Sequence, residues 1–193
     1  PGDFRRQYQF LTTHYKSIIS VHIPNSVSGT MQSAQTAVKR LPGSSVTVLD
    51  SLNISVGQGL IVAHAARMVK AGKSHIEIVE GVNHARDITK VYCCVKDLSY
   101  SVRGGRVPNS VKVIADLLHI RPILTTNESG KLEKAGAVLG KNNLGKKMVK
   151  YMNKNHDNTK PFRISVGHCN CPEEGQALIH GLKKLLLVMH ILL

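Results

Sequence analysis

The residues Ser28, Gly29 and Thr30 form a turn whose side chains could bind a small anion. They follow the apolar run SIISVHI (17–23), which predicts a buried strand, and they precede a helical pattern. The first turn of a helix carries unpaired N–H groups and the positive end of the helix dipole. A glycine lets a ligand approach the backbone, and the hydroxyls add donors. The turn therefore predicts either a pocket for a carboxylate or phosphate or, equally well, a helix with Ser28 as its N-cap.

A second turn of the same kind occurs in DSLNISVGQG (50–59). Ser51, Ser55 and Gly57 lie between a strand-like run, SVTVLD (45–50), and a helical pattern. Because the carboxyl ends of neighbouring parallel strands meet at one edge of a sheet, the two turns could converge on one crevice. These three residues are therefore candidate ligand-pocket residues. The alternative is that the glycines of this segment only let the helix pack closely against the sheet.

Arg106 could supply a positive charge to such a site. It ends the sequence G-G-R within RGGRV (103–107). Arginine binds carboxylates and phosphates through two parallel hydrogen bonds, and the neighbouring glycines would let the guanidinium approach the backbone and a ligand. The alternative is a basic surface loop.

Other chemistries lack parts of their usual motifs. Ser28 stands in V-S-G-T and not in G-x-S-x-G, so the nucleophile turn of a serine hydrolase is absent. Segment 140–147 has the spacing of a phosphate-binding loop, but Lys147 stands where Ser or Thr should hold magnesium, so a phosphotransfer enzyme lacks a convincing magnesium site. The H-C-N-C run at 168–171 has no second spaced pair of ligands, so no metal site is predicted. The four cysteines suggest no disulfide framework, which favours a reducing, cytoplasmic setting.

The elements that would position these residues alternate in the first half of the chain. Strands are predicted at 17–23 and 45–50. One helix is expected to begin after Ser28, and another to begin with Ser55 as its N-cap and to end near Gly72. Strand–helix alternation with short links predicts a parallel sheet with helices on its faces. The first three residues, P-G-D, resemble a loop.

The second half predicts a second domain, with the boundary near residues 85–91. The last residues, GLKKLLLVMHILL, predict a docked helix or the cut end of a longer chain, and their apolar run is too short to span a bilayer. Further strands are expected at 91–95 and 161–168, and two strands joined by a turn at Ser129-Gly130 are expected at 121–140. Further helices are expected at 110–119, 141–156 and 173–184.

Composition and charge limit the class of partner. The chain has 193 residues, of which 42% are hydrophobic and 4% aromatic, with no tryptophan, so its core must be aliphatic and surfaces for base stacking are scarce. The net charge is +14, and residues 101–160 hold 12 Lys or Arg against 4 Asp or Glu. This excess favours an acidic partner, such as nucleic acid, an anionic ligand, a membrane surface or an acidic protein, unless it is a solvated face.

Three blocks of the sequence together resemble the DegV family of bacterial fatty-acid-binding proteins. Their order and spacing cover about residues 3–140, which makes the resemblance more specific than any single motif. The blocks are SIISVHIPNSVSGTMQSAQTAV, then DSLNISVGQGLIVAHAARMVKAGKSHIEI, then VKDLSYSVRGGRV with LLHIRPILTTNESGKLEKAGAVLG.

The resemblance implies a two-domain α/β protein of the family's EDD fold that buries a long-chain fatty acid. Ser28, with Gly29 and Thr30, would hold the carboxylate, and Arg106 would lie near it or face a partner. That partner would be a fatty acid kinase subunit, which phosphorylates the carboxylate for phospholipid synthesis. The chain would then be a cytoplasmic carrier and not an enzyme, with the fatty acid as its ligand and no metal or cofactor.

The resemblance also predicts the domain organisation. Residues 1–88 would form a partial first domain with a parallel sheet flanked by helices, and residues 89–193 a second α/β domain with a mixed sheet. The family pattern includes an N-terminal segment that would precede Pro1 and a terminal histidine followed by Gly-Pro-Gly. We therefore expect the chain to be truncated, with an incomplete carboxylate site.

The alternative function is that of a basic nucleic-acid-binding domain. The charge of +14 favours it, whereas the scarcity of aromatic residues and the lack of a known motif count against it. Neither nucleic-acid binding nor a membrane span is expected.

Overall fold

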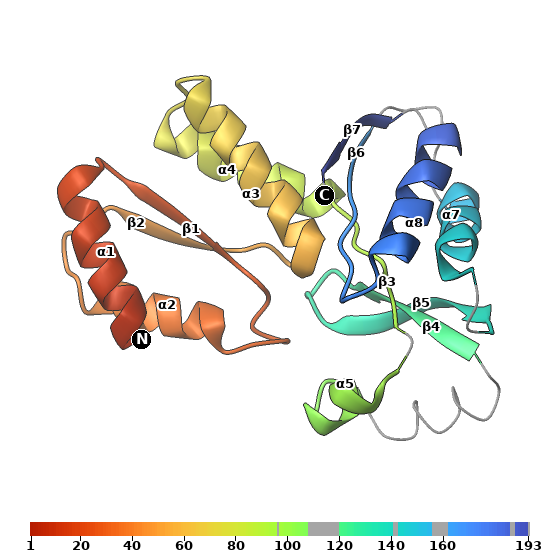
Figure 1. Cartoon of the computed structure of the whole chain (residues 1–193). Helices are drawn as coiled ribbons and strands as arrows, with labels where there is room; N and C mark the ends of the chain where they lie inside the picture. Colours follow the sequence, from red (N-terminus) through yellow and green to blue (C-terminus); the bar gives the residue numbers. More distant parts are fainter. Residues whose placement is uncertain (96, 108–119, 141–142, 156–161, 186–187, 193) are drawn as a thin grey trace. The chain divides into compact units, whose positions relative to one another are not determined.

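The chain folds into two compact units. The computed structural model describes residues 1–95, 97–107, 120–140, 143–155, 162–185 and 188–192 (Figure 1). The first unit comprises Pro1–Val91 together with Thr126–Lys131, and the second comprises Tyr92–Thr125 and Leu132–Leu193.

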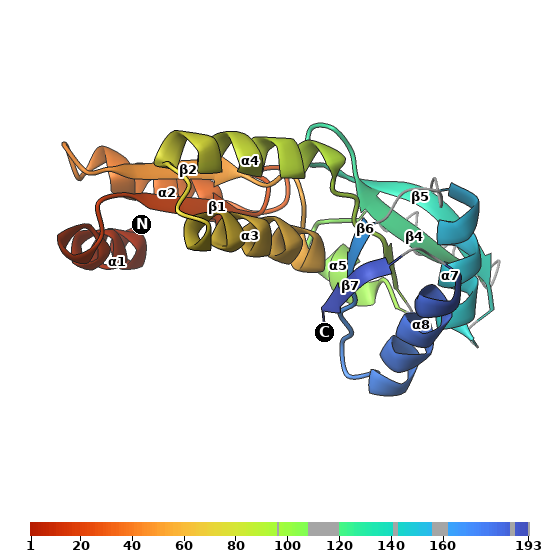
Figure 2. The same ribbon diagram turned by 90° about the horizontal axis from the view of Figure 1, so that it is seen from above.

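The first unit is a short parallel sheet with helices on both faces. Strands β1 and β2 pair in parallel, from Ile18 opposite Val46 to His22 opposite Asp50, so both strands end at the same edge. Helices α3 and α4 run side by side in both views (Figure 1 and Figure 2). In chain order the elements are α1 (Gly2–His14), β1 (Ile18–His22), α2 (Thr30–Lys39), β2 (Val46–Asp50), α3 (Ser55–Lys70) and α4 (His75–Ile88).

The two faces of this sheet have separate apolar cores, because successive side chains of a strand point to opposite faces. On one face, Ile19, Val21 and Leu49 pack against buried side chains of α3 and α4. On the other face, Val46 and Val48 pack against buried side chains of α1 and α2. The α/β class and the parallel sheet with helices on its faces are confirmed.

Two helices of the first unit were not predicted. The P-G-D start is not a loop, since α1 begins at Gly2, and the prediction was wrong. Tyr8 of this helix is buried, and its ring lies beside that of Phe4 one turn earlier. Helix α4 begins with a capping box between Ser74 and Glu77 and buries one face against the sheet and α3.

The starts of α2 and α3 also differ from expectation. Gly29, not Ser28, is the N-cap of α2. Helix α3 has Ile54 as its N-cap with no side-chain cap bond, so the prediction that Ser55 caps this helix is wrong. Ser55 is instead the first helical residue, with a φ of 50°.

The second unit contains both parallel and antiparallel strand pairs. Strands β3, β4 and β5 form one sheet in that order, with β3 antiparallel to β4, whereas β6 pairs in parallel with β7. Among the described strands, the two kinds of pairing therefore lie in separate sheets. The elements are β3 (Cys93–Cys94), α5 (Ser99–Arg103), β4 (Ile120–Thr126), β5 (Leu132–Leu139), α7 (Leu144–Asn155), β6 (Phe162–Ser165), α8 (Pro172–Leu185) and β7 (Val188–Leu192).

Most elements of the second unit match their predictions, and the C-terminal end does not. Residues 188–192 form strand β7, not a docked helix, and this strand adds to β6. The expected helix at 110–119 lies outside the described residues.

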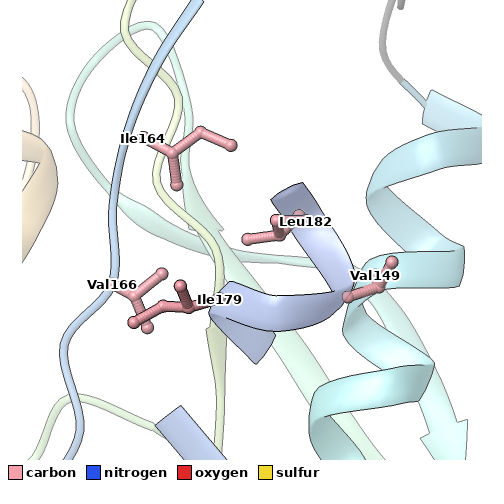
Figure 3. Close-up of a cluster of buried hydrophobic side chains, with 5 residues drawn as sticks. All are labelled: Val149, Ile164, Val166, Ile179 and Leu182. Atoms are coloured by element: carbon pink, nitrogen blue, oxygen red, sulfur yellow. The ribbon is translucent and has the colours of Figure 1, made fainter. Parts of the chain in front are cut away.

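The core of the second unit lies where α7, α8 and the β6 segment meet (Figure 3). Helices α7 and α8 approach closely because glycines face the neighbouring helix. A Cβ on Gly145 would lie 3.1 Å from the Glu174 carbonyl oxygen, and one on Gly181 would lie 2.8 Å from a Val149 methyl carbon. The core side chains are Val149, Ile164, Val166, Ile179 and Leu182.

Candidate functional site

The turn between β1 and α2 brings two hydroxyl groups together. The Oγ of Ser28 and the Oγ1 of Thr30 are 2.7 Å apart, and the Thr30 N–H donates to Ser28 Oγ at 3.3 Å. Both side chains are half-buried, and Gly29 between them is exposed. One hydroxyl must donate to the other, which leaves the second hydroxyl hydrogen free to donate to a ligand.

Gly29 leaves open space at the start of α2. Its φ of −71° is accessible to any residue, and a Cβ added there would meet no atom within 4 Å. Neither the backbone nor packing therefore requires glycine at this position. The first turn of α2 contains no acidic side chain and its N-cap makes no side-chain bond, so the N–H groups that follow that of Thr30 could serve an anion.

The second turn follows the neighbouring strand at the same edge of the sheet. Ser51 is fully buried, and its Oγ donates to the Asn53 carbonyl at 2.8 Å and accepts from the Asn53 N–H at 3.2 Å. The Ser51 N–H donates to the His22 carbonyl at 2.9 Å, which ties the ends of β2 and β1 together. Ser51 therefore stabilises the turn itself.

Gly57 and Ser55 differ in their surroundings. A Cβ on Gly57 would lie 2.7 Å from Asn53 Oδ1 and 3.1 Å from Val91 Cβ, so packing requires glycine there. Ser55 is exposed, and as a non-glycine residue with positive φ it carries backbone strain. A role for Ser51, Ser55 and Gly57 in a ligand pocket stays a prediction.

Arg106 belongs to the second unit, whereas the Ser28 turn belongs to the first. It follows α5, where Gly105 has a φ of 73° and the Arg106 N–H donates to the Ser101 carbonyl at 2.9 Å. Its side chain is exposed, and Nη1 donates to the Gly104 carbonyl at 2.5 Å. Arg103 lies over the Tyr100 ring, 4.8 Å from its centre.

A row of polar groups on α1 and β1 was not predicted from the sequence. The OH of Tyr8 lies 2.7 Å from Ser20 Oγ, which lies 2.8 Å from Nε2 of the buried His22. Burial lowers the pKa of His22, and the charge of Asp50 opposes this shift. Burial likewise raises the pKa of Tyr8, against the bond from Ser20. The signal was the alternation of Ser20 and His22 with apolar residues, which places both on the face toward α1.

The cysteines are free thiols in this structure. Burial raises the pKa of Cys94 to about 11 and also raises that of Cys93, so both thiols are protonated at neutral pH. Within the described ranges, no three or more His, Cys, Asp or Glu side chains gather in a way that could hold a metal. In the same ranges, every helix is too short or too polar to cross a membrane.

Sequence relatives extend well beyond the length of this chain. A DegV domain-containing protein of Staphylococcus aureus is 36% identical over 132 residues, which cover 68% of this chain and 47% of the relative. The chain thus spans about half the length of the curated relatives it matches first.

Solved structures share the fold. One, named for the fatty-acid binding of a DegV family protein from Thermus thermophilus, matches with a TM-score of 0.83 and 27% identity over 100% of this chain and 68% of that one. Another, the Streptococcus pneumoniae Fatty Acid Kinase B3 protein loaded with linoleic acid, has a TM-score of 0.83 at 23% identity, with 97% and 68% covered. The model of the DegV family, a family described as uncharacterised, matches residues 1–192. The chain therefore belongs to the DegV family.

Proposed function

We propose that this protein binds a long-chain fatty acid and that the Ser28–Thr30 turn holds its carboxylate. The observation that carries this proposal is the hydroxyl pair of Ser28 and Thr30 beside the open space at Gly29. A carboxylate accepts hydrogen bonds and is stabilised by the positive end of a helix dipole. This turn supplies hydroxyl donors and the N-terminus of α2. The fatty-acid binding named for the relative from Thermus thermophilus, at 27% identity, supports the choice of ligand.

The chemistry of a fatty acid fits the composition of the chain. Each buried CH₂ group contributes about 0.8 kcal/mol, so a long tail favours binding to an aliphatic protein. A carboxylate removed from water without hydrogen bonds would cost several kcal/mol, so it requires a polar site at one end. Ser51, Ser55 and Gly57 would border this site from the second turn.

We further propose that the protein presents the bound carboxylate to a fatty acid kinase subunit in the cytoplasm. The chain would then act as a carrier, and the partner would supply the phosphoryl-transfer chemistry. The proposal comes from the family resemblance, and the Streptococcus pneumoniae protein of the same fold carries the kinase in its name.

Mass spectrometry of lipids extracted from the purified protein tests the binding directly. We expect a long-chain fatty acid in the extract, and saturable binding when the lipid-free protein is titrated with palmitic acid. An extract without fatty acid, together with no binding in the titration, would contradict the proposal.

Ser28→Ala tests the role of the turn. Loss of one hydrogen bond to a charged group should weaken palmitic-acid binding about 10- to 100-fold in calorimetric titration. Ser45→Ala is the matched control, because Ser45 is exposed and precedes β2 at the opposite edge of the sheet. Equal affinity of the Ser28 variant and the wild type would mean that Ser28 only shapes the turn.

Arg106→Ala tests the partner-facing role of the G-G-R arginine. The side chain is exposed and bonded within its own loop, so we expect unchanged fatty-acid affinity and slower phosphorylation of the bound acid by the kinase. Arg103→Ala is the control, because Arg103 stacks on Tyr100 nearby. A loss of fatty-acid affinity in the Arg106 variant would assign the arginine to the ligand instead.

A further inference from the structure

The tip of the β4–β5 hairpin packs against the loop that leads into the Ser28 turn. This tip, defined here as residues 127–130, belongs with Thr126 and Lys131 to the first unit, whereas the hairpin residues up to Thr125 and from Leu132 onward belong to the second. The Oγ of Ser26 donates to the Gly130 carbonyl at 2.8 Å. Ser26, which lies two residues before Ser28 of the proposed carboxylate-binding turn, is thus bonded to a segment far along the chain.

Gly130 makes the closest approach in this contact. It is buried and has a φ of 73°, a conformation that favours glycine. A Cβ added there would lie 2.6 Å from Pro24 Cβ, 2.8 Å from Pro24 Cγ and 3.3 Å from Leu52 Cδ2. The tip therefore contacts the segments that follow both β1 and β2, and any larger residue would push it away.

The tip is held in shape by Asn127. Its Oδ1 accepts from the Ser129 N–H at 3.0 Å, the Ser129 hydroxyl at 2.8 Å and the Lys131 N–H at 3.0 Å. The Gly130 N–H also donates to the Asn127 carbonyl at 2.8 Å. These bonds fix the Gly130 carbonyl in the position where it receives the Ser26 hydroxyl.

Pro24 connects the tip to Ser28. It is fully buried, and its carbonyl accepts from the Val27 and Ser28 N–H groups, both at 3.0 Å. The position of Pro24 therefore sets the position of the Ser28 backbone. Gly130 packs against one side of Pro24, and the Ser26 bond holds the residues between Pro24 and Ser28.

We infer that the hairpin tip positions the carboxylate-binding turn, with Gly130 and Ser26 as positioning residues that do not themselves contact the ligand. This inference rests on the proposed fatty-acid function. It predicts that disturbing the tip weakens recognition of the carboxylate while leaving recognition of the acyl tail intact.

The test compares palmitic acid with its methyl ester, which keeps the tail and lacks the charge. We expect Gly130→Ala to lower affinity for the acid about tenfold or more and to change affinity for the ester less than about twofold, since only the hydrogen bonds to the charged head are lost. Gly72→Ala is the matched control. Gly72 has a φ of 72° but open space at its Cβ, so this variant has the same backbone strain without the steric contact, and both affinities should be unchanged.

Ser26→Ala gives a second measurement that does not depend on a strained glycine. We expect affinity for the acid to fall about two- to tenfold, as for the loss of one neutral hydrogen bond, and affinity for the ester to stay constant. The inference is overturned if both variants bind the acid with the same affinity as the wild type. It is also overturned if both variants lose affinity for the acid and for the ester to the same extent. If the wild type binds neither compound, the proposed function fails as well.

Discussion

At the scale of the residue, β1 carries two polar systems toward its carboxyl end. The Ser28 and Thr30 hydroxyls lie on the turn beyond the strand, and the row of Tyr8, Ser20 and His22 lies on the strand face toward α1. The Phe4 ring meets the His22 ring edge-on at 5.2 Å between centres. The row thus fixes α1 against the strand that leads into the turn.

His22 should make stability depend on pH. Because burial lowers the pKa of the folded His22 below 6.5, the unfolded chain takes up its proton first as pH falls. The contribution is therefore fully present above about pH 6.5 and is lost as pH falls through the folded-state pKa. We expect the urea midpoint of the wild type to drop between pH 7.5 and 5.5.

The His22→Gln variant should show a smaller drop over the same interval. His84→Gln, which changes an exposed histidine, should behave like the wild type. If the His22 variant kept the full pH dependence, another group would be responsible for it.

The Ser28–Thr30 turn could be predicted from sequence because its parts are adjacent: Ser28, Gly29 and Thr30 follow a strand and precede a helix. The binding of a carboxylate by this turn stays a proposal. The contact of Ser26 with Gly130 could not be predicted, since no local pattern indicates which distant loop will meet a turn. The histidine in β1 was missed because a polar residue in an apolar run gives no sign of its partners.

At the scale of the element, helix starts depend on local hydrogen bonds that the sequence shows only in part. The Ser74-x-x-Glu77 pair is a capping box and was an available signal for α4. Ser55 is an equally suitable residue type, yet Ile54 occupies the N-cap position of α3, where there is no side-chain cap bond. At the C-terminal end, the segment VMHIL (188–192) is short and apolar, a pattern that fits a strand or a buried helix. Its pairing with β6 shows that it is a strand.

Substitution of the two serines tests this difference. Ser74→Ala should lower the free energy of unfolding by about 1 kcal/mol, because it removes the acceptor for the Glu77 N–H. Ser55→Ala should change it by less than about 0.5 kcal/mol. Thermal unfolding of both variants measures the effects, and equal losses would mean that Ser55 also caps its helix in solution.

Glu77 also belongs to this cap. It accepts from the Ser74 N–H at 2.8 Å and from Lys73 Nζ at 2.8 Å, and the bond from Lys73 is the main cause that lowers its pKa to about 2. Its contribution to the cap is thus present above about pH 4.5 and is lost only as pH falls toward about 2.

At the scale of the whole molecule, positive charge dominates. The chain holds 26 Lys or Arg against 12 Asp or Glu. Helix α7 exposes Lys146, Lys150 and Lys154 on one side, while Leu144 and Met148 are buried on the other. Such a stripe attracts anions without selecting a sequence of bases.

Binding to a random DNA duplex should accordingly be weak and sensitive to salt. We expect fluorescence anisotropy to detect binding at 50 mM NaCl and none at 200 mM, since counterion release dominates contacts with phosphates. Palmitic-acid binding should be the same at both salt concentrations, apart from a small change at the head group. Tight binding to one DNA sequence at 200 mM NaCl would instead favour a nucleic-acid-binding domain.

The Ser26–Gly130 bond has a consequence for the order of events during synthesis. The two residues are 104 positions apart, and a ribosome adds about 5–20 residues per second, so about 5 to 20 s separate their appearance. Strands β1 and β2 can pair during this interval, while Pro24 still lacks the glycine that covers it. In a nascent chain, the Ser26–Gly130 bond that holds the loop before Ser28 would therefore form only after the hairpin has left the ribosome.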